Sequence, residues 1–137
     1  MIHSLDYGAN LLAAACGDGS LAILQQQGPS LVLVARIPEA HSGPVAQAIF
    51  PWPADNHRLL ASVGNDQMIV LWDLGTMLCP DDSITASLER LSLADPEQPR
   101  TLLAWSHTGK PNWMVSGAAQ TLMVADTSKD ITVYSVR

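Results

Sequence analysis

Residues 41–73 read HSGPVAQAIFPWPADNHRLLASVGNDQMIVLWD, and this stretch decides the fold. Two largely apolar segments, 59–63 and 68–72, flank the tripeptide Gly64-Asn65-Asp66. Because Gly and Asn tolerate the positive φ angles of a tight turn, the stretch predicts a β-hairpin. The second segment is apolar at every position, which is typical of a strand that is covered on both faces. The hairpin is therefore expected to lie between two neighbouring layers.

The same pattern occurs again along the chain. A shift of 48 positions places Leu12-Ala13 on Leu60-Ala61 and Asp18 on Asp66. A fainter third copy, at residues 121–134, needs a shift of 62 positions. Such repetition predicts an architecture in which each unit buries its faces against its neighbours.

The longer second shift indicates an insertion, which we place at residues 77–100. This segment carries three prolines and five acidic residues and has little strand character. Within it, Ile84, Leu88 and Leu91 follow helical spacing after Asp82-Ser83, a plausible N-cap. We therefore expect a surface excursion with one short helix.

Three units are expected within a single domain of residues 1–137. They cover residues 2–37, 41–105 (with the insertion 77–100) and 107–137. The third unit has three strands where four are expected. The expected strands are 2–6, 11–16, 31–37, 45–50, 59–63, 68–72, 102–105, 113–116, 122–125 and 131–136.

Four residues of the first-quoted stretch have a recognisable arrangement. His41 lies in a loop, Ser62 on a strand, Asp66 in a tight turn and Trp72 at the end of the next strand, followed by Asp73. This arrangement resembles a blade of the WD-repeat family. The resemblance implies an all-β fold, a partial β-propeller of about three four-stranded blades whose last blade lacks one strand. It also implies a buried hydrogen-bond chain that runs from the Asp through the His and the Ser to the Trp, with a structural role.

Three blades are fewer than a closed ring contains. Closed propellers need about four to eight blades, and WD propellers usually close by borrowing a strand from the N-terminus. We therefore expect the chain to be the C-terminal part of a longer propeller. The alternative is a three-bladed protein that completes a ring by self-association.

The residue types of a catalytic triad are also present in this blade. A triad needs an exposed Ser, a His that acts as its base and an Asp that orients the His. Ser62 follows an apolar segment within a strand and has no nucleophile elbow around it. The chain is therefore not expected to be an enzyme, and a serine hydrolase that uses Ser62 and His41 is a remote alternative.

The other two units carry only parts of the pattern. The first has Ala14 and Leu24 in the Ser and Trp positions. In the third, Ser128 takes the Asp position and Tyr134 the Trp position, and His107 is expected in the preceding loop. These units predict partial networks only.

Two tryptophans and two further histidines need an interpretation. Trp52 lies between two prolines in a loop, where it is a candidate interface anchor, although packing under the loop is the alternative. Trp113 is expected in the core. His3 and His57 have no partners at metal-ligand spacing, so neither a metal site nor a cofactor site is predicted.

Composition limits the classes of partner. The chain has 137 residues with 13 acidic and 7 basic side chains, a net charge of −6, which argues against nucleic acid or an anionic membrane. Cys16 and Cys79 are widely separated, which fits a reducing compartment. No secretory signal is visible and the apolar runs are strand-sized. We expect an intracellular protein, cytoplasmic or nuclear, and no small-molecule ligand.

The family resemblance implies the function. WD-repeat proteins are non-catalytic scaffolds that present loops to protein partners. A narrower implication is a substrate receptor of a cullin-RING (cullin 4 type) ubiquitin ligase, which docks on the damaged-DNA-binding adaptor subunit. Such receptors often carry Trp-Asp-x-Arg, whereas here Trp72 and Asp73 are followed by Leu74 and Gly75, which weakens that implication.

Overall fold

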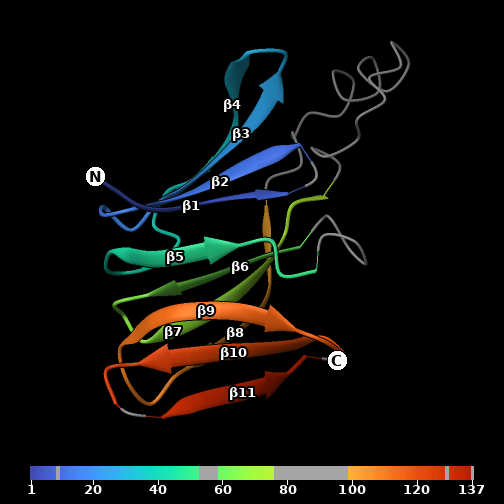
Figure 1. Cartoon of the computed structure of the whole chain (residues 1–137). Helices are drawn as coiled ribbons and strands as arrows, with labels where there is room; N and C mark the ends of the chain where they lie inside the picture. The colour runs from blue at the N-terminus through green and yellow to red at the C-terminus, as the bar shows by residue number, and fades with distance from the viewer. Residues whose placement is uncertain (9, 53–58, 76–98, 129, 137) are drawn as a thin grey trace.

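The computed structural model describes residues 1–8, 10–52, 59–75, 99–128 and 130–136 (Figure 1). These residues contain eleven strands in three antiparallel sheets of four, four and three strands. Sheet 1 contains β1 (Ile2–Gly8), β2 (Leu11–Cys16), β3 (Leu21–Gln27) and β4 (Ser30–Ile37). Sheet 2 contains β5 (Val45–Ile49), β6 (Leu59–Gly64), β7 (Met68–Asp73) and β8 (Arg100–Ser106). Sheet 3 contains β9 (Pro111–Gly117), β10 (Thr121–Asp126) and β11 (Ile131–Ser135).

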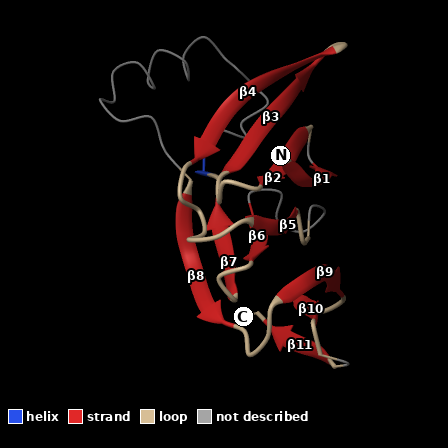
Figure 2. Ribbon diagram, turned by 90° about the vertical axis from the view of Figure 1, so that its left-hand side faces the viewer, coloured by secondary structure: helices blue, strands red, loops and turns tan. Residues whose placement is uncertain are grey.

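Within each sheet the strands follow one another in chain order. The chain then passes from the last strand of one sheet to the first strand of the next. The first strands β1, β5 and β9 lie on one side of the molecule and β4 and β8 on the other, and the sheets stack as layers (Figures 1 and 2). This is the arrangement of consecutive blades around a propeller axis, with the first strand of each sheet innermost.

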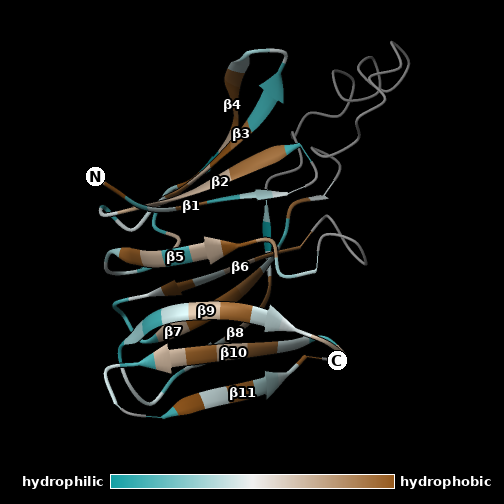
Figure 3. Cartoon of the chain, in the orientation of Figure 1, coloured by the Kyte–Doolittle hydropathy of each residue, from teal (hydrophilic) through white to brown (hydrophobic). Residues whose placement is uncertain are grey.

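Sheet 2 is buried on both faces because its side chains alternate between two cores. Leu60, Val70 and Trp72 belong to the cluster shared with sheet 1, whereas Ala61 and Ile69 belong to the cluster shared with sheet 3. Both faces of β7 are therefore apolar, as its colour in Figure 3 shows. The burial of both faces explains the uninterrupted apolar segment in the sequence.

Polar side chains from the innermost strands also join one sheet to the next. The backbone amides of Ala48 and Phe50 donate to Ser4 Oγ at 3.2 Å and to Asp6 Oδ2 at 2.8 Å. In the same way the amide of Met114 donates to the buried Gln47 Oε1. The inner edges of β5 and β9 thus obtain hydrogen-bond partners from the preceding sheet, which satisfies amides that pair with no strand on that side.

The expected all-β partial propeller is confirmed, with three antiparallel sheets and three strands in the last described sheet. The ten expected strand ranges agree with observed strands to within a few residues. The eleventh strand, β3 (Leu21–Gln27), lies where the shift of 48 positions places the segment 68–72. The insertion at 77–100 and its expected helix fall almost wholly on 76–98, outside the described residues.

Candidate functional site

The four residues of the WD-type pattern lie in one chain of hydrogen bonds within sheet 2. The indole Nε1 of Trp72 lies 2.9 Å from Ser62 Oγ, and that oxygen lies 2.8 Å from His41 Nε2. The other ring nitrogen, His41 Nδ1, lies 3.0 Å from Asp66 Oδ1. Ser62 and His41 are buried, at 0% and 4% exposure.

With a neutral His41 imidazole, only one assignment of donors and acceptors satisfies all four residues of the hydrogen-bond chain. An indole can only donate and a carboxylate can only accept. Trp72 therefore donates to Ser62, the Ser62 hydroxyl donates to His41 Nε2, and His41 Nδ1–H donates to Asp66. This assignment follows from the partners of each group.

Asp66 connects this buried chain to the surrounding loops. Its carboxylate also accepts from the backbone amides of Ser42 and Met68, each at 3.0 Å. Burial by itself raises the pKa of Asp66, but the hydrogen bonds from His41, Met68 and Ser42 together hold that pKa below its ordinary value. One carboxylate thus ties the loop that precedes β5 to the turn between β6 and β7.

The turn depends on Gly64 for steric reasons. A Cβ atom at Gly64 would lie 2.5 Å from His41 Nδ1 and 2.8 Å from Asp66 Oδ1. Any side chain there would push apart the two groups that form the hydrogen bond. Gly64 is therefore part of the site although it contributes no polar side-chain atom.

This geometry does not support the remote hydrolase alternative. A nucleophile must reach its substrate, whereas Ser62 is 0% exposed and its oxygen lies between His41 and Trp72. Both hydrogen-bond partners of the Ser62 hydroxyl, His41 and Trp72, are buried, so a substrate cannot approach this oxygen. The residues resemble a triad in type only.

Sheet 3 contains a second hydrogen-bonded His, His107, whose acidic partner the sequence did not reveal. His107 is 2% exposed, and its Nδ1 lies 2.7 Å from the Tyr134 hydroxyl. Its Nε2 lies 2.7 Å from Asp126 Oδ2. Ser128 does align with Asp66, but the carboxylate that binds the imidazole comes from Asp126. Asp126 occupies the place that Gly64 holds in sheet 2.

The ring of His107 is used the other way round from that of His41. Its Nε2–H donates to the carboxylate, and the Tyr134 hydroxyl donates to Nδ1 of the neutral ring. Ser128 contributes by donating its backbone amide to Asp126 at 2.6 Å. Hydrogen bonds from the Ser128 side chain and amide, then from His107, lower the pKa of Asp126.

Sheet 1 secures its equivalent turn with an exposed carboxylate, that of Asp18, which binds the buried Ser20. Asp18 accepts from the Ser20 hydroxyl and amide and from Arg36 Nη2 at 2.9 Å. The hydrogen bonds from Ser20 are the main cause that lowers the pKa of Asp18. The Asp18 and Arg36 side chains are more than half exposed, so their ion pair adds little stability.

The structure decides between the two interpretations of Trp52 and corrects the placement of Trp113. Trp52, the candidate interface anchor, is 7% exposed and packs in the core between sheets 2 and 3. The interface interpretation is therefore corrected, and the alternative of packing in the core is observed. Trp113, expected in the core, is 59% exposed because the side chain of its neighbour Met114 points inward instead.

Asp73 and Gly75 form a turn at the end of β7. The Gly75 amide donates to Asp73 Oδ1 at 2.8 Å, and Gly75 has a φ of 63°. This positive φ favours Gly over the Arg that adaptor-binding receptors often have here. The departure from the Trp-Asp-x-Arg motif thus fits the local backbone.

The remaining candidates supply no further site. His3 Nδ1 lies 3.0 Å from the Val45 carbonyl oxygen, which His3 reaches from β1, and His57 lies outside the described residues. In the described ranges no group of three His, Cys, Asp or Glu side chains could hold a metal ion. That part of the chain also contains no helix long and apolar enough to cross a membrane.

Comparison with known proteins supports the fold. No family model matches the chain, and no curated protein matches it. The chain is similar to a chain in the crystal structure of a mitotic checkpoint complex, with a TM-score of 0.68 and 13% identity. The match covers 98% of this chain and 35% of that chain, so this chain spans about a third of the structure it matches.

Together the stacked sheets and this match define a β-propeller-like repeat fold. At 13% identity the similarity concerns the fold alone.

Proposed function

We propose that the chain is a non-catalytic protein–protein interaction scaffold of the WD-repeat type. The observation that carries the proposal is the burial of its reactive side chains. His41, Ser62 and His107 are all below 5% exposure and are hydrogen-bonded inside the fold. Their hydrogen bonds hold loops in place, so the function is expected at the loop surface.

The loops at this end of the sheets are also linked to one another. The His41 amide donates to the Gly19 carbonyl at 3.0 Å, and the His107 amide donates to the Gln67 carbonyl at 2.7 Å. Each bond joins the loop before one sheet to the turn of the preceding sheet. The result is a continuous platform across three sheets, which lowers the ordering cost of binding a partner.

The platform exposes polar side chains that a protein partner could contact. They come from the turns of all three sheets, and the described ones include Asp18, Arg36, Ser42, Asn65, Gln67, Lys110 and Ser128. Both signs of charge are present. This composition suits the polar rim of a protein interface.

A matched pair of variants tests the proposal. Asn65→Arg changes an exposed side chain on the platform, and Gln27→Arg makes a comparable change at the other end of sheet 1. Affinity purification with quantitative mass spectrometry identifies partners, and titration with the purified partner then gives the Kd. We expect a partner that the wild type and Gln27→Arg retain and Asn65→Arg loses. Equal retention by all three proteins would contradict binding at the platform.

A narrower form of the proposal is a substrate receptor of a cullin 4 type ubiquitin ligase. It rests on the resemblance to the C-terminal part of WD repeat-containing protein 53, and it includes an intracellular location, cytoplasmic or nuclear. Gly75 in place of the Arg counts against it. A direct titration with the purified adaptor subunit tests it, and absent binding would reject this form while leaving the scaffold proposal intact.

A further inference from the structure

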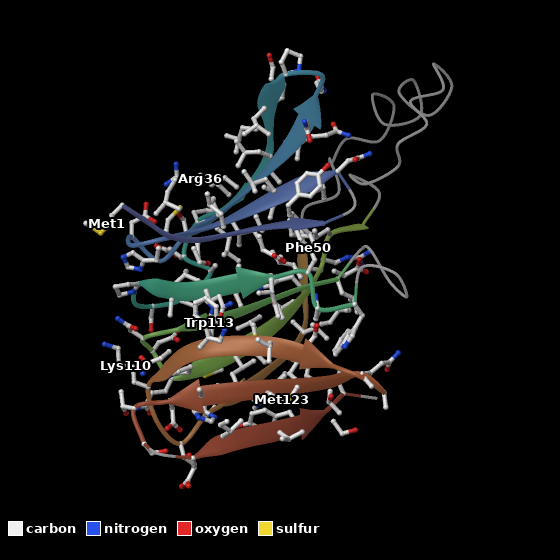
Figure 4. All side chains as sticks on the ribbon, viewed as in Figure 1. Met1, Arg36, Phe50, Lys110, Trp113 and Met123 are labelled. Carbon is white, nitrogen blue, oxygen red and sulfur yellow. The ribbon has the colours of Figure 1, made fainter. Side chains whose placement is uncertain are left out.

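A row of four neighbouring side chains lies at the junction of sheets 2 and 3. It runs from Trp105 on β8 through Tyr134 on β11 and His107 in the loop before β9 to Asp126 at the end of β10. The loop of His107 ends at Lys110, which Figure 4 labels beside sheet 3. Trp and Tyr are among the side chains that lose one electron most easily. The row therefore places an oxidisable pair of rings next to a buried base.

The geometry of the row suits the removal of one electron together with one proton. The rings of Trp105 and Tyr134 meet edge to face, with their centroids 5.3 Å apart. The Tyr134 hydroxyl lies 2.7 Å from His107 Nδ1 and donates to it, so the phenol proton already points at a base within transfer distance. On the other side of the imidazole, His107 Nε2–H donates to Asp126 Oδ2 at 2.7 Å.

Asp126 prepares His107 to accept that proton. Hydrogen bonds from Ser128, and then from His107, hold the pKa of Asp126 below its ordinary value, so this carboxylate is ionised at neutral pH. An imidazolium formed at His107 makes a charge-assisted hydrogen bond to a carboxylate that is already in place. The side chains of His107 and Asp126 are only 0% and 5% exposed, so water screens their attraction little.

The other tyrosine of the chain has no such base. Tyr7 and Tyr134 are the two tyrosines, and the Tyr7 hydroxyl donates to Asn10 Oδ1 at 3.1 Å. An amide oxygen does not take up a proton near neutral pH. Tyr7 is also 54% exposed, whereas Tyr134 is partly buried against the core, so a dissolved oxidant reaches Tyr7 more readily. Exposure and proton transfer thus favour different tyrosines.

Trp105 adds a route for the electron. Its buried indole Nε1–H has no hydrogen-bond acceptor among the described residues. A Trp105 radical cation therefore has no base in that part of the chain to take its proton, and it remains a strong oxidant. The adjacent phenol of Tyr134 can supply the missing electron, because its own proton moves to His107 at the same time.

We propose that Tyr134 is a site of proton-coupled one-electron oxidation, with His107 as the proton acceptor. An oxidant of the carbonate radical class takes one electron, from Tyr134 directly or through Trp105, and becomes carbonate. The Tyr134 O–H bond breaks and the proton forms a bond to His107 Nδ1, which leaves a neutral tyrosyl radical and an imidazolium held by Asp126. A one-electron reductant such as ascorbate returns the electron, and the proton moves back to the oxygen. The inference concerns oxidation and does not depend on the proposed scaffold function.

Two variants that each keep a single tyrosine test which residue is oxidised. Tyr7→Phe keeps Tyr134, and Tyr134→Phe keeps Tyr7. Photo-oxidised ruthenium tris-bipyridine serves as the oxidant of the full chain, and electron paramagnetic resonance with ring-deuterated tyrosine separates tyrosyl from tryptophanyl radicals. We expect the wild type and Tyr7→Phe to give equal tyrosyl yields. The yield of Tyr134→Phe should be at least about tenfold lower, since a positioned base accelerates proton transfer by about 10²–10⁴-fold.

A second measurement, on Tyr7→Phe, tests the role of His107 without altering sheet 3. The radical should form more slowly in heavy water than in ordinary water. Its high-field spectrum should show the g value of a phenoxyl oxygen that accepts a hydrogen bond, because the proton now lies on His107. An unchanged rate in heavy water, or the spectrum of a phenoxyl oxygen without a hydrogen bond, would overturn the proton transfer.

Circular dichroism and the Tm check that both variants are folded. If Tyr134→Phe gives as much tyrosyl radical as Tyr7→Phe, oxidation follows exposure to solvent and the proposal is wrong. If Tyr134→Phe does not fold, the two measurements on Tyr7→Phe decide the question alone.

Discussion

The clearest test of the hydrogen-bond chain is Ser62→Ala. The change removes one oxygen atom from a site with 0% exposure, so it leaves almost no cavity. It leaves Trp72 Nε1 and His41 Nε2 without the partner that lies 2.9 and 2.8 Å away, respectively. An orphaned buried polar group costs about 1–3 kcal/mol. Because the two groups share one partner and can relax partly, we expect a total loss of about 2–4 kcal/mol.

Urea unfolding monitored by circular dichroism measures this loss as a change in the free energy of unfolding. For a chain of this size, about 1 kcal/mol corresponds to about 3–4 °C in Tm, so thermal melts should show a fall of about 6–16 °C. Ser42→Ala is the matched control, because Ser42 is exposed and contributes its backbone amide, which Ala retains. We expect that control to lie within about 0.5 kcal/mol of the wild type. A Ser62→Ala protein as stable as the control would show that the hydrogen-bond chain from Trp72 to Asp66 does not hold the loops.

Further predictions concern the turns and their acidic groups. Gly64→Ala should destabilise by more than about 2 kcal/mol, since its Cβ would lie 2.5 Å from His41 Nδ1, and an unchanged urea midpoint would contradict this. Tyr134→Phe should cost about 1–3 kcal/mol in the same assay by removing the hydroxyl 2.7 Å from the buried imidazole of sheet 3. Arg36→Ala should change stability by less than about 1 kcal/mol, because its ion pair is exposed; a larger loss would show that the pair matters. The folded-state pKa of Asp66 lies below its unfolded value of about 3.9, so its contribution is complete above that pH and is lost as the pH falls. Asp66→Asn should therefore flatten the acid limb of the stability profile, and parallel limbs for the two proteins would contradict the lowered pKa.

The hairpin of sheet 2 could be predicted because its signals are local. The tripeptide Gly64-Asn65-Asp66 marks the position of the turn, and the apolar segments on either side specify the strands. The positive φ of this turn falls on Gln67, at 67°, and not on Gly64 or Asn65 as expected. Trp113 could not be placed correctly, because both faces of β9 carry a large apolar side chain and strand periodicity alone does not say which face is inside. The observed pairing of Met114 with Val124 turns Met114 inward and Trp113 outward.

The polar contacts between sheets carried no sequence signal. Ser4 and Gln47 bind backbone amides that lie 44 and 67 residues away. Every residue except proline has a backbone amide, so the sequence does not show which amide a given polar side chain will bind. Likewise, alignment assigned the acidic position of sheet 3 to Ser128, whereas Asp126 reaches the imidazole because the ring can present either nitrogen.

The three sheets secure equivalent turns with different chemistry, and this difference bears on function. Sheet 2 uses a four-residue chain that ends on Trp72, sheet 3 uses Tyr134 and Asp126 around His107, and sheet 1 uses the exposed pair of Asp18 and Arg36. A catalytic site would require particular groups at one place. The three turns differ in the residues they use but share one result. In each, an acidic side chain is fixed by hydrogen bonds next to a loop at the same end of the sheets. The common feature is thus the rigidity of the platform, which is the property that a protein-binding scaffold requires.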